Sequence, residues 1–201
     1  EKNLDKLIDM AGKLLKDTAP GVTRGLRNGL YPGSKWEQYL WGVIDNTDHH
    51  VLKTAVLAGG YEAAFRGLRN TTENAEKEQC NVPWIILFDP TSACNKHCVG
   101  CWAADYGNSL NLTYEEMDRL VTEGSELGCH LYMLTGGEPL VRKRDVIRLA
   151  EAHNDCLFNI FTNASLIDQE FCDDVKRVGN IVFSVSLEGT EDSNDGRRGD
   201  G

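Results

Sequence analysis

The stretch that decides the fold is Thr91-Ser-Ala-Cys-Asn-Lys-His-Cys-Val-Gly-Cys-Trp102, which directly follows the apolar run Trp84–Phe88. Its cysteines, Cys94, Cys98 and Cys101, have the spacing C-x3-C-x2-C, and the next cysteine along the chain is Cys129. Fully closed iron–sulfur sites of ferredoxins use four cysteines. Three clustered thiolates can instead hold three irons of a 4Fe–4S cluster and leave the fourth iron open to a ligand.

From Pro83 onward, short apolar runs alternate with amphipathic helical patterns. Thr113 and Glu116 form a capping box at the start of the first helix, which has Met117, Leu120, Val121 and Leu127 on its expected inner face and ends at Gly128. Alternating strands and helices are typical of a parallel sheet that curls toward a barrel. We therefore predict an α/β fold, a partial (βα) barrel with strands at 84–88, 130–134, 157–161 and 181–187 and later helices at 145–153 and 168–178.

The first 80 residues predict an N-terminal all-helical region, so we divide the chain into residues 1–80 and 81–201. Apolar residues recur at helical spacing between Leu4 and Leu15 and again between Trp36 and Ile44, and a third helix is expected over about 50–70. The aromatic stripe of Trp36, Tyr39 and Trp41 is interpreted as helix packing. The polar stretch 70–81 is interpreted as a linker or helix end.

Composition excludes several classes of protein. The 201-residue chain has a formal charge of −10, which argues against broad nucleic-acid binding. No run reaches the roughly 18 to 20 apolar residues that a membrane span needs. Seven cysteines, three of them bunched, fit metal binding in a reducing compartment better than a disulfide framework, so we expect a cytoplasmic protein.

Each further motif that could carry chemistry lies at the carboxyl end of a predicted strand or soon after it. Thr135-Gly-Gly-Glu-Pro139 follows the second strand and Thr162-Asn-Ala-Ser165 the third, whereas Ser186-Leu-Glu-Gly189 ends the fourth and Gly196-Arg-Arg-Gly199 comes soon after. In parallel α/β sheets, ligands bind at the carboxyl ends of the strands. The sequence therefore predicts that all four loops meet the cysteine loop on one rim.

With the cysteine run after one strand and Gly136-Gly137-Glu138-Pro139 after the next, the stretch 83–201 resembles the radical S-adenosylmethionine (radical SAM) enzymes. The resemblance implies that Cys94, Cys98 and Cys101 hold a 4Fe–4S cluster whose free iron binds SAM. One electron, delivered by a donor such as a flavodoxin or ferredoxin, would then release a 5′-deoxyadenosyl radical that takes hydrogen from a substrate. The substrate, the reaction outcome and whether SAM is consumed stay open.

The resemblance and simple chemistry together suggest cofactor-binding residues. Glycines let a backbone approach a ligand, a carboxylate accepts from an ammonium group, and an arginine pairs with a carboxylate in a bidentate way. Asn163, Ser184 and Ser186 could also be ordinary turn or spacer residues. The expected cofactor-binding set is Gly136, Gly137, Glu138, Asn163, Ser184, Ser186, Glu188 and Arg198, with Arg197 the weaker choice of the two arginines.

Two departures from the family pattern leave alternatives open. Gly100 stands before the third cysteine where the family often has an aromatic residue, and Trp102 follows that cysteine instead. The family's barrel also has more strands than four, so we expect a truncated core. The alternatives are a structural zinc site with His97 as fourth ligand, and a non-catalytic iron–sulfur protein or degenerate partner subunit. The remaining cysteines are expected to be buried small side chains or inert surface thiols.

Overall fold

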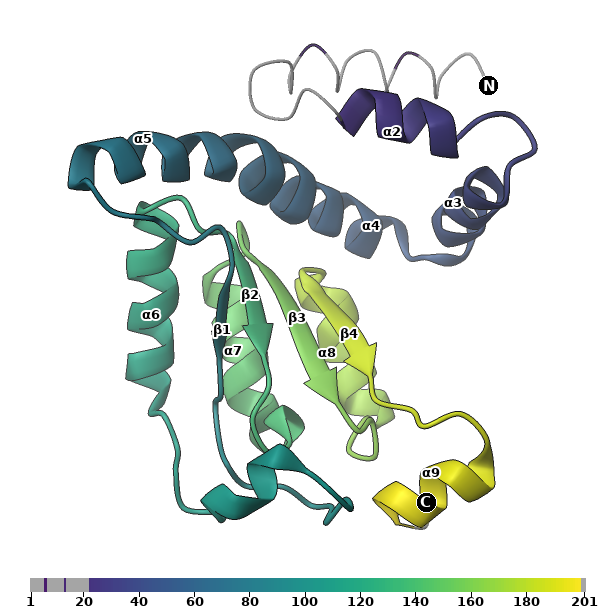
Figure 1. Ribbon diagram of the computed structural model, residues 1–201, viewed down its shortest axis with the longest axis vertical. Helices are drawn as coiled ribbons and strands as arrows, with labels where there is room; N and C mark the ends of the chain where they lie inside the picture. The colour runs from purple at the N-terminus through teal and green to yellow at the C-terminus, as the bar shows by residue number, and fades with distance from the viewer. Residues whose placement is uncertain (1–5, 7–12, 14–21, 200–201) are drawn as a thin grey trace.

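A four-stranded parallel sheet forms the centre of the structure, a computed structural model that describes residues 6, 13 and 22–199. The strands lie in the order β1-β2-β3-β4 (Figure 1), so each new strand is added beside the previous one. The bounds are Ile86–Phe88 for β1, Leu131–Leu134 for β2, Leu157–Thr162 for β3 and Ile181–Val185 for β4. The predicted α/β class and its four parallel strands are thus confirmed.

Three helices cover one face of this sheet. They are α6 (Tyr114–Glu126), α7 (Lys143–Ala152) and α8 (Gln169–Val178), and each follows the strand before it along the chain. The predicted capping box begins α6, because Thr113 Oγ1 accepts from the Glu116 amide while the Glu116 carboxylate accepts from the Thr113 amide. At the end of α8, Gly179 adopts a left-handed conformation with φ +77°, which a glycine adopts without strain.

The hydrophobic core lies between the sheet and these helices. Successive strands place one residue each at the same level, Phe88, Leu134, Ile160 and Phe183, and a second level contains Ile86, Tyr132, Phe158 and Ile181. Tyr132 stacks on Phe158 with ring centroids 5.7 Å apart, and its hydroxyl contacts the carbonyl of Val121 within α6 and that of Cys129 after the helix. Buried apolar surface of this extent is the main stabilising contribution to such a fold.

The helix face predicted for α6 is only partly buried. Met117 and Val121 are fully buried as expected, but Leu120 and Leu127 are exposed. The reason is the position of α6 beside β1, which is an edge strand, so α6 has a neighbouring helix on one side only. The sequence pattern predicts the apolar stripe of α6 but not how much of that stripe is buried.

The N-terminal region forms a helical layer across the amino-terminal ends of the strands. A long continuous helix consists of α4 (His49–Ala55), a π-helical stretch η1 (Val56–Gly67) and α5 (Leu68–Glu78), and it crosses the end where the strands begin (Figure 1). Two shorter helices, α2 (Val22–Gly29) and α3 (Lys35–Asn46), precede it. The predicted helix over 4–15 lies outside the described residues, apart from residues 6 and 13.

The structure decides two expectations for this region. The polar stretch after Asn70 is a helix end and not a linker, because it continues as helix α5 to Glu78, where intrahelical ion pairs such as Arg69–Glu73 suit an exposed helix. The aromatic stripe on α3 is not helix packing either, since no residue of α3 is buried and Trp36 and Tyr39 are each 66% exposed. Local periodicity predicted the helix but could not tell whether a partner covers it.

Candidate functional site

The three clustered thiols converge on one cavity in the loop after β1. Cys94, Cys98 and Cys101 line a hollow of about 260 Å³ together with His97 and Gly137. A turn in which the Cys101 amide donates to the Cys98 carbonyl, at 3.2 Å, draws the last two cysteines together. Burial raises the pKa of the Cys94 thiol, and the neighbouring Glu138 carboxylate adds to the shift. Three sulfur ligands converging on one hollow fit a soft, thiolate-binding metal group.

The glycine turn after β2 is joined to the start of the cysteine loop by backbone hydrogen bonds. The Gly137 amide donates to the Thr91 carbonyl at 3.0 Å, and the Glu138 amide donates to the Ala93 carbonyl at 2.8 Å. A Cβ on Gly137 would lie 2.2 Å from the Ala93 carbonyl oxygen, and one on Gly136, which has φ +108°, would lie 2.5 Å from that of Thr91. The two glycines therefore make room for the cysteine loop itself.

Glu138 is fully buried, and its carboxylate connects the loops after β2 and β3. Its Oε1 accepts from the Thr162 hydroxyl at 2.7 Å and from the Leu140 amide at 3.0 Å, while its Oε2 accepts from the Asn163 amide at 2.8 Å. All three recorded donors are uncharged. A carboxylate has about four lone-pair positions, so Oε2 can still accept one further donor. A buried carboxylate is most stable beside a cation.

Asn163 connects the loop after β3 to the cysteine loop. Its side-chain amide donates to Oδ1 of Asn95 at 3.0 Å, and Asn95 in turn donates to the Ser165 hydroxyl at 2.8 Å. Asn95 lies between the first two cysteines of the motif. The predicted residues Gly137, Glu138 and Asn163 therefore form one hydrogen-bonded unit with the cysteine loop, and Gly136 packs closely against the start of that loop.

Glu188 and Arg198, both predicted cofactor contacts, are paired with each other. The guanidinium of Arg198 contacts Oε1 of Glu188, and Arg197 Nη1 lies 2.7 Å from Oε2. The Arg198 guanidinium holds the pKa of the Glu188 carboxyl below its usual range, and Arg197 contributes to the shift. Both arginines lie in the last turn of helix α9 (Glu191–Arg198), which the sequence analysis did not predict. The Val99 amide donates to the Arg197 carbonyl at 2.8 Å, so α9 contacts the cysteine loop.

The two predicted serines lie farther from the thiols along β4. The Ser184 hydroxyl donates to Oδ1 of Asn159 at 3.0 Å, on the face of the sheet that the helices leave uncovered. The Ser186 amide donates to the Thr162 carbonyl at 3.0 Å, just beyond the end of β4. The strand ends two residues earlier than predicted, because its partner β3 ends at Thr162. Neither serine hydroxyl takes part in the unit around Glu138.

Sequence reasoning missed three residues that belong to this rim: Thr162, Asn95 and Asp89. Thr162 and Asn95 hold Glu138 and Asn163 as described above, and both lie within stretches that the sequence analysis had already quoted. Asp89 follows β1 and lines a hollow of about 460 Å³ with Trp102, Tyr106 and the two glycines. Its Oδ1 is buried without a recorded partner, and burial raises the pKa of its carboxyl. The sequence signal that could have identified Asp89 is its position as a polar residue directly after an apolar strand.

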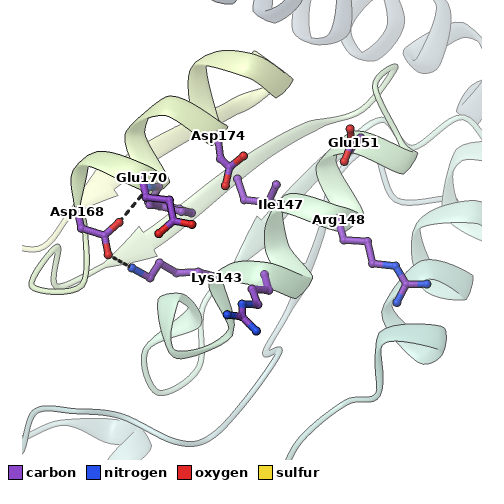
Figure 2. A pocket seen from close by; sticks show the side chains of 9 residues that line it. Lys143, Ile147, Arg148, Glu151, Asp168, Glu170 and Asp174 are labelled. Carbon is purple, nitrogen blue, oxygen red and sulfur yellow. Dashed lines mark hydrogen bonds and ion pairs between the residues drawn. The ribbon is translucent and has the colours of Figure 1, made fainter.

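Another hollow, of about 420 Å³, lies between α7 and α8 on the outer side of the helical layer. Figure 2 shows Lys143 directed toward Asp168, with which it forms an ion pair. Arg148 lies over the ring of Tyr114, 3.5 Å from its centroid. Lys143 and Arg148 are therefore engaged by the chain's own groups, whereas Arg144, which also lines the hollow, forms no ion pair with another described residue.

Comparison with protein families agrees with this geometry. The model of the radical SAM superfamily matches residues 88–200, more than half of the chain. The chain belongs to the radical SAM superfamily. No helix among the described residues combines the length and apolar character that crossing a bilayer requires.

Curated relatives with enzymatic names match the same part of the chain. An Fe-coproporphyrin III synthase of Methanosarcina barkeri is 34% identical over 119 residues, which cover 57% of this chain and 30% of that protein. A GTP 3′,8-cyclase of Desulforamulus reducens is 33% identical over 110 residues, covering 51% of this chain and 34% of that protein. The chain thus spans about a third of the length of these relatives.

Among solved structures, SuiB of Streptococcus suis bound to its precursor peptide SuiA has a TM-score of 0.54 at 20% identity. The match covers 68% of this chain and 32% of that one. At this level of identity the likeness supports the fold alone. The relatives and the family model establish an enzyme family whose members differ in reaction.

Proposed function

We propose that this chain contains the cluster- and SAM-binding part of a radical SAM enzyme. One observation carries the proposal: Gly137, of the motif after β2, lines the same cavity as Cys94, Cys98 and Cys101. A metal group held by the thiols would therefore adjoin the turn that presents Glu138. When bound, a 4Fe–4S cluster with SAM supplies a 5′-deoxyadenosyl radical that removes a hydrogen atom from the substrate.

The chain's own residues would bind and orient the cofactor. We assign the three thiolates to three irons and the free acceptor position of Glu138 to the ammonium group of SAM. The backbone of the glycine turn would approach the same ligand. Arg198 would bind the carboxylate of SAM while it stays in contact with Glu188. Arg197 would hold the second oxygen of Glu188, so that Glu188 neutralises only part of the Arg198 charge. Asn163, Ser184 and Ser186 are proposed contacts of the remaining polar groups of SAM.

The substrate would lie against the uncovered face of the sheet. That face presents Met133, Asn159, Phe161, Val182 and Ser184, a mixture of apolar and hydrogen-bonding groups. The relatives act on molecules as different as a porphyrin, a nucleotide and a peptide by their names. We therefore propose hydrogen abstraction from a substrate whose class is open. A reduced flavodoxin or ferredoxin would deliver the electron, in the cytoplasm.

The test is anaerobic reconstitution with iron and sulfide, followed by a strong reductant and SAM. We expect one 4Fe–4S cluster per chain and release of 5′-deoxyadenosine, measured by absorbance, iron analysis and chromatography. Replacing any one of the three loop cysteines with alanine should abolish the cluster, whereas Cys156→Ala should keep it. Stoichiometric zinc without iron would overturn the proposal. A stable cluster with no SAM cleavage would instead support the non-catalytic alternative.

A further inference from the structure

A second group of potential metal ligands lies at the other end of the strands. His130 immediately precedes β2, and Asp155 and Cys156 immediately precede β3, so their side chains meet at the rim where the strands begin. The cysteine loop follows β1 at the opposite rim (Figure 1). His130 and Cys156 are buried, whereas the Asp155 side chain is 46% exposed. This group therefore forms no part of the radical SAM site.

The potential ligand atoms of this group lie close enough together to share one metal ion, all within 4.8 Å of one another. His130 Nδ1 lies 3.4 Å from Asp155 Oδ2 and 3.7 Å from Cys156 Sγ, which lies 3.7 Å from Asp155 Oδ1. The nitrogen–oxygen contact is longer than a typical hydrogen bond of about 2.9–3.0 Å. The two sulfur contacts lie within the range of sulfur hydrogen bonds, and Asp155 contacts its two partners through different oxygens. Tetrahedral zinc with bonds of about 2.0–2.1 Å to nitrogen and oxygen and about 2.3 Å to sulfur separates its ligands by roughly 3.3–3.6 Å.

From this agreement we infer that His130, Asp155 and Cys156 bind a zinc-type divalent ion. One nitrogen, one sulfur and one oxygen donor form a mixed set that suits zinc or cobalt, and a single thiolate is too few for an iron–sulfur cluster. Three protein ligands leave the fourth tetrahedral position to water. The exposed side of Asp155 gives that water and the entering ion access from solvent.

The backbone that carries two of the ligands is held rigidly in place. The side-chain amide of Asn180 donates to the carbonyls of Ala150, His153 and Cys156 at 2.9–3.0 Å, which fixes the turn between α7 and β3. The Leu157 amide donates to the His130 carbonyl at 2.8 Å and so fixes the spacing of the two strand starts. A preorganised turn of this kind lowers the cost of bringing the ligands together.

The ion would lie beneath the helix that crosses the sheet. A Cβ on Gly67, at the end of η1, would lie 3.4 Å from Cδ2 of His130 and 2.5 Å from the Gly128 carbonyl oxygen. η1 therefore packs directly against the histidine. An ion at this point would stabilise the starts of β2 and β3 beneath the N-terminal helices. Its role would be structural, and it would not depend on SAM or on the cluster.

The test uses the full chain with all three loop cysteines changed to alanine, so that the thiols of the other rim cannot compete. We expect this variant to bind one equivalent of Co²⁺, with a thiolate-to-cobalt charge-transfer band and the visible bands of tetrahedral cobalt. Zn²⁺ should displace the cobalt and raise the melting temperature. Because the background variant cannot hold the cluster, the result does not depend on the proposed function.

Two further variants identify the ligands. Cys156→Ser should abolish the charge-transfer band, and Asp155→Asn, at a half-exposed position that tolerates change, should weaken Co²⁺ binding at least tenfold. Cys172→Ser is the matched control and should leave both the band and the affinity unchanged. Failure of the background variant to bind cobalt, or a band that survives Cys156→Ser, would mean that the three groups only pack together. Equal affinity in Asp155→Asn would also overturn the three-ligand site.

Discussion

Replacing Glu138 with glutamine separates the two tasks that the structure gives to this carboxylate. The substitution keeps the size of the side chain but removes its charge and turns one acceptor oxygen into a donor. In the structure Oε1 serves the Thr162 hydroxyl and the Leu140 amide, and Oε2 serves the Asn163 amide. An amide nitrogen in the position of Oε2 would face the Asn163 N–H, so one buried donor would lose its acceptor.

Both consequences have an expected size. An unsatisfied buried donor costs about 1–3 kcal/mol of stability, so the free energy of unfolding of the protein without cofactor should fall by that amount. Loss of a charged hydrogen bond to the ammonium group of SAM is worth roughly 1.5–3 kcal/mol, so SAM affinity should fall about ten- to hundred-fold. Denaturant titration measures the first quantity, and calorimetry on anaerobically reconstituted protein measures the second.

Thr162→Val is the matched control, because it removes a hydrogen bond to the same carboxylate and leaves its charge in place. Thr162 is buried, and its hydroxyl also accepts from the Ala164 amide, so the variant should lose a comparable amount of stability. Its SAM affinity should stay within a few-fold of the original. Equal losses of SAM affinity in the two variants would refute the reasoning, since the effect would then come from loosened loops and not from charge.

Three other substitutions test separate parts of the structure. Gly137→Ala should lower the free energy of unfolding by about 1–3 kcal/mol and weaken cluster assembly, since its Cβ would lie 2.2 Å from the Ala93 carbonyl oxygen. The control Gly42→Ala, which has open space around it, should change neither quantity. Denaturation measures the stability, and iron content measures cluster assembly. The lowered pKa of Glu188 means that its ion pairs stabilise the contact of α9 at pH values above about 4.3 and are lost as pH falls through the lower folded value. Hydrogen exchange of α9 in the apoprotein should therefore speed up in acid, and Glu188→Gln should show fast exchange at every pH; slow exchange in that variant at neutral pH would contradict the assigned pairing. Finally, the 201-residue chain should self-associate through the edge strand β4, and Val185→Lys should reduce the association measured by sedimentation; a monomeric parent chain would show the expectation wrong.

The fold could be predicted because its signals are local. Four apolar runs, a capping box at Thr113 and a glycine at position 179 marked the strands and helices that the structure contains. Exposure could not be predicted in the same way. Trp36 on α3 and Leu120 on α6 belong to correct apolar stripes, but their burial depends on whether another element lies opposite them. That information is not contained in a single stretch of sequence.

The candidate site could be located from the sequence but not resolved into contacts. The rule that ligands bind at the carboxyl ends of parallel strands brought the cysteine loop, Glu138 and Asn163 together correctly in space. It could not show that Glu138 is already held by three uncharged donors, or that Glu188 is engaged by Arg197 and Arg198. The pairing of Glu188 depends on helix α9, which periodicity did not reveal.

The distance between the two rims of the sheet has a consequence for how such a chain can change over evolution. The helix formed by α4, η1 and α5 crosses the ends where the strands begin, while the cysteine loop and the glycine turn lie where strands finish. Substitutions in the N-terminal helices therefore reach the reactive loops only through the length of the strands. We therefore expect that substitutions confined to that helical layer leave the geometry of the cysteine loop and the glycine turn unchanged. A designer could likewise graft a different helical cap onto this sheet without redesigning the loops.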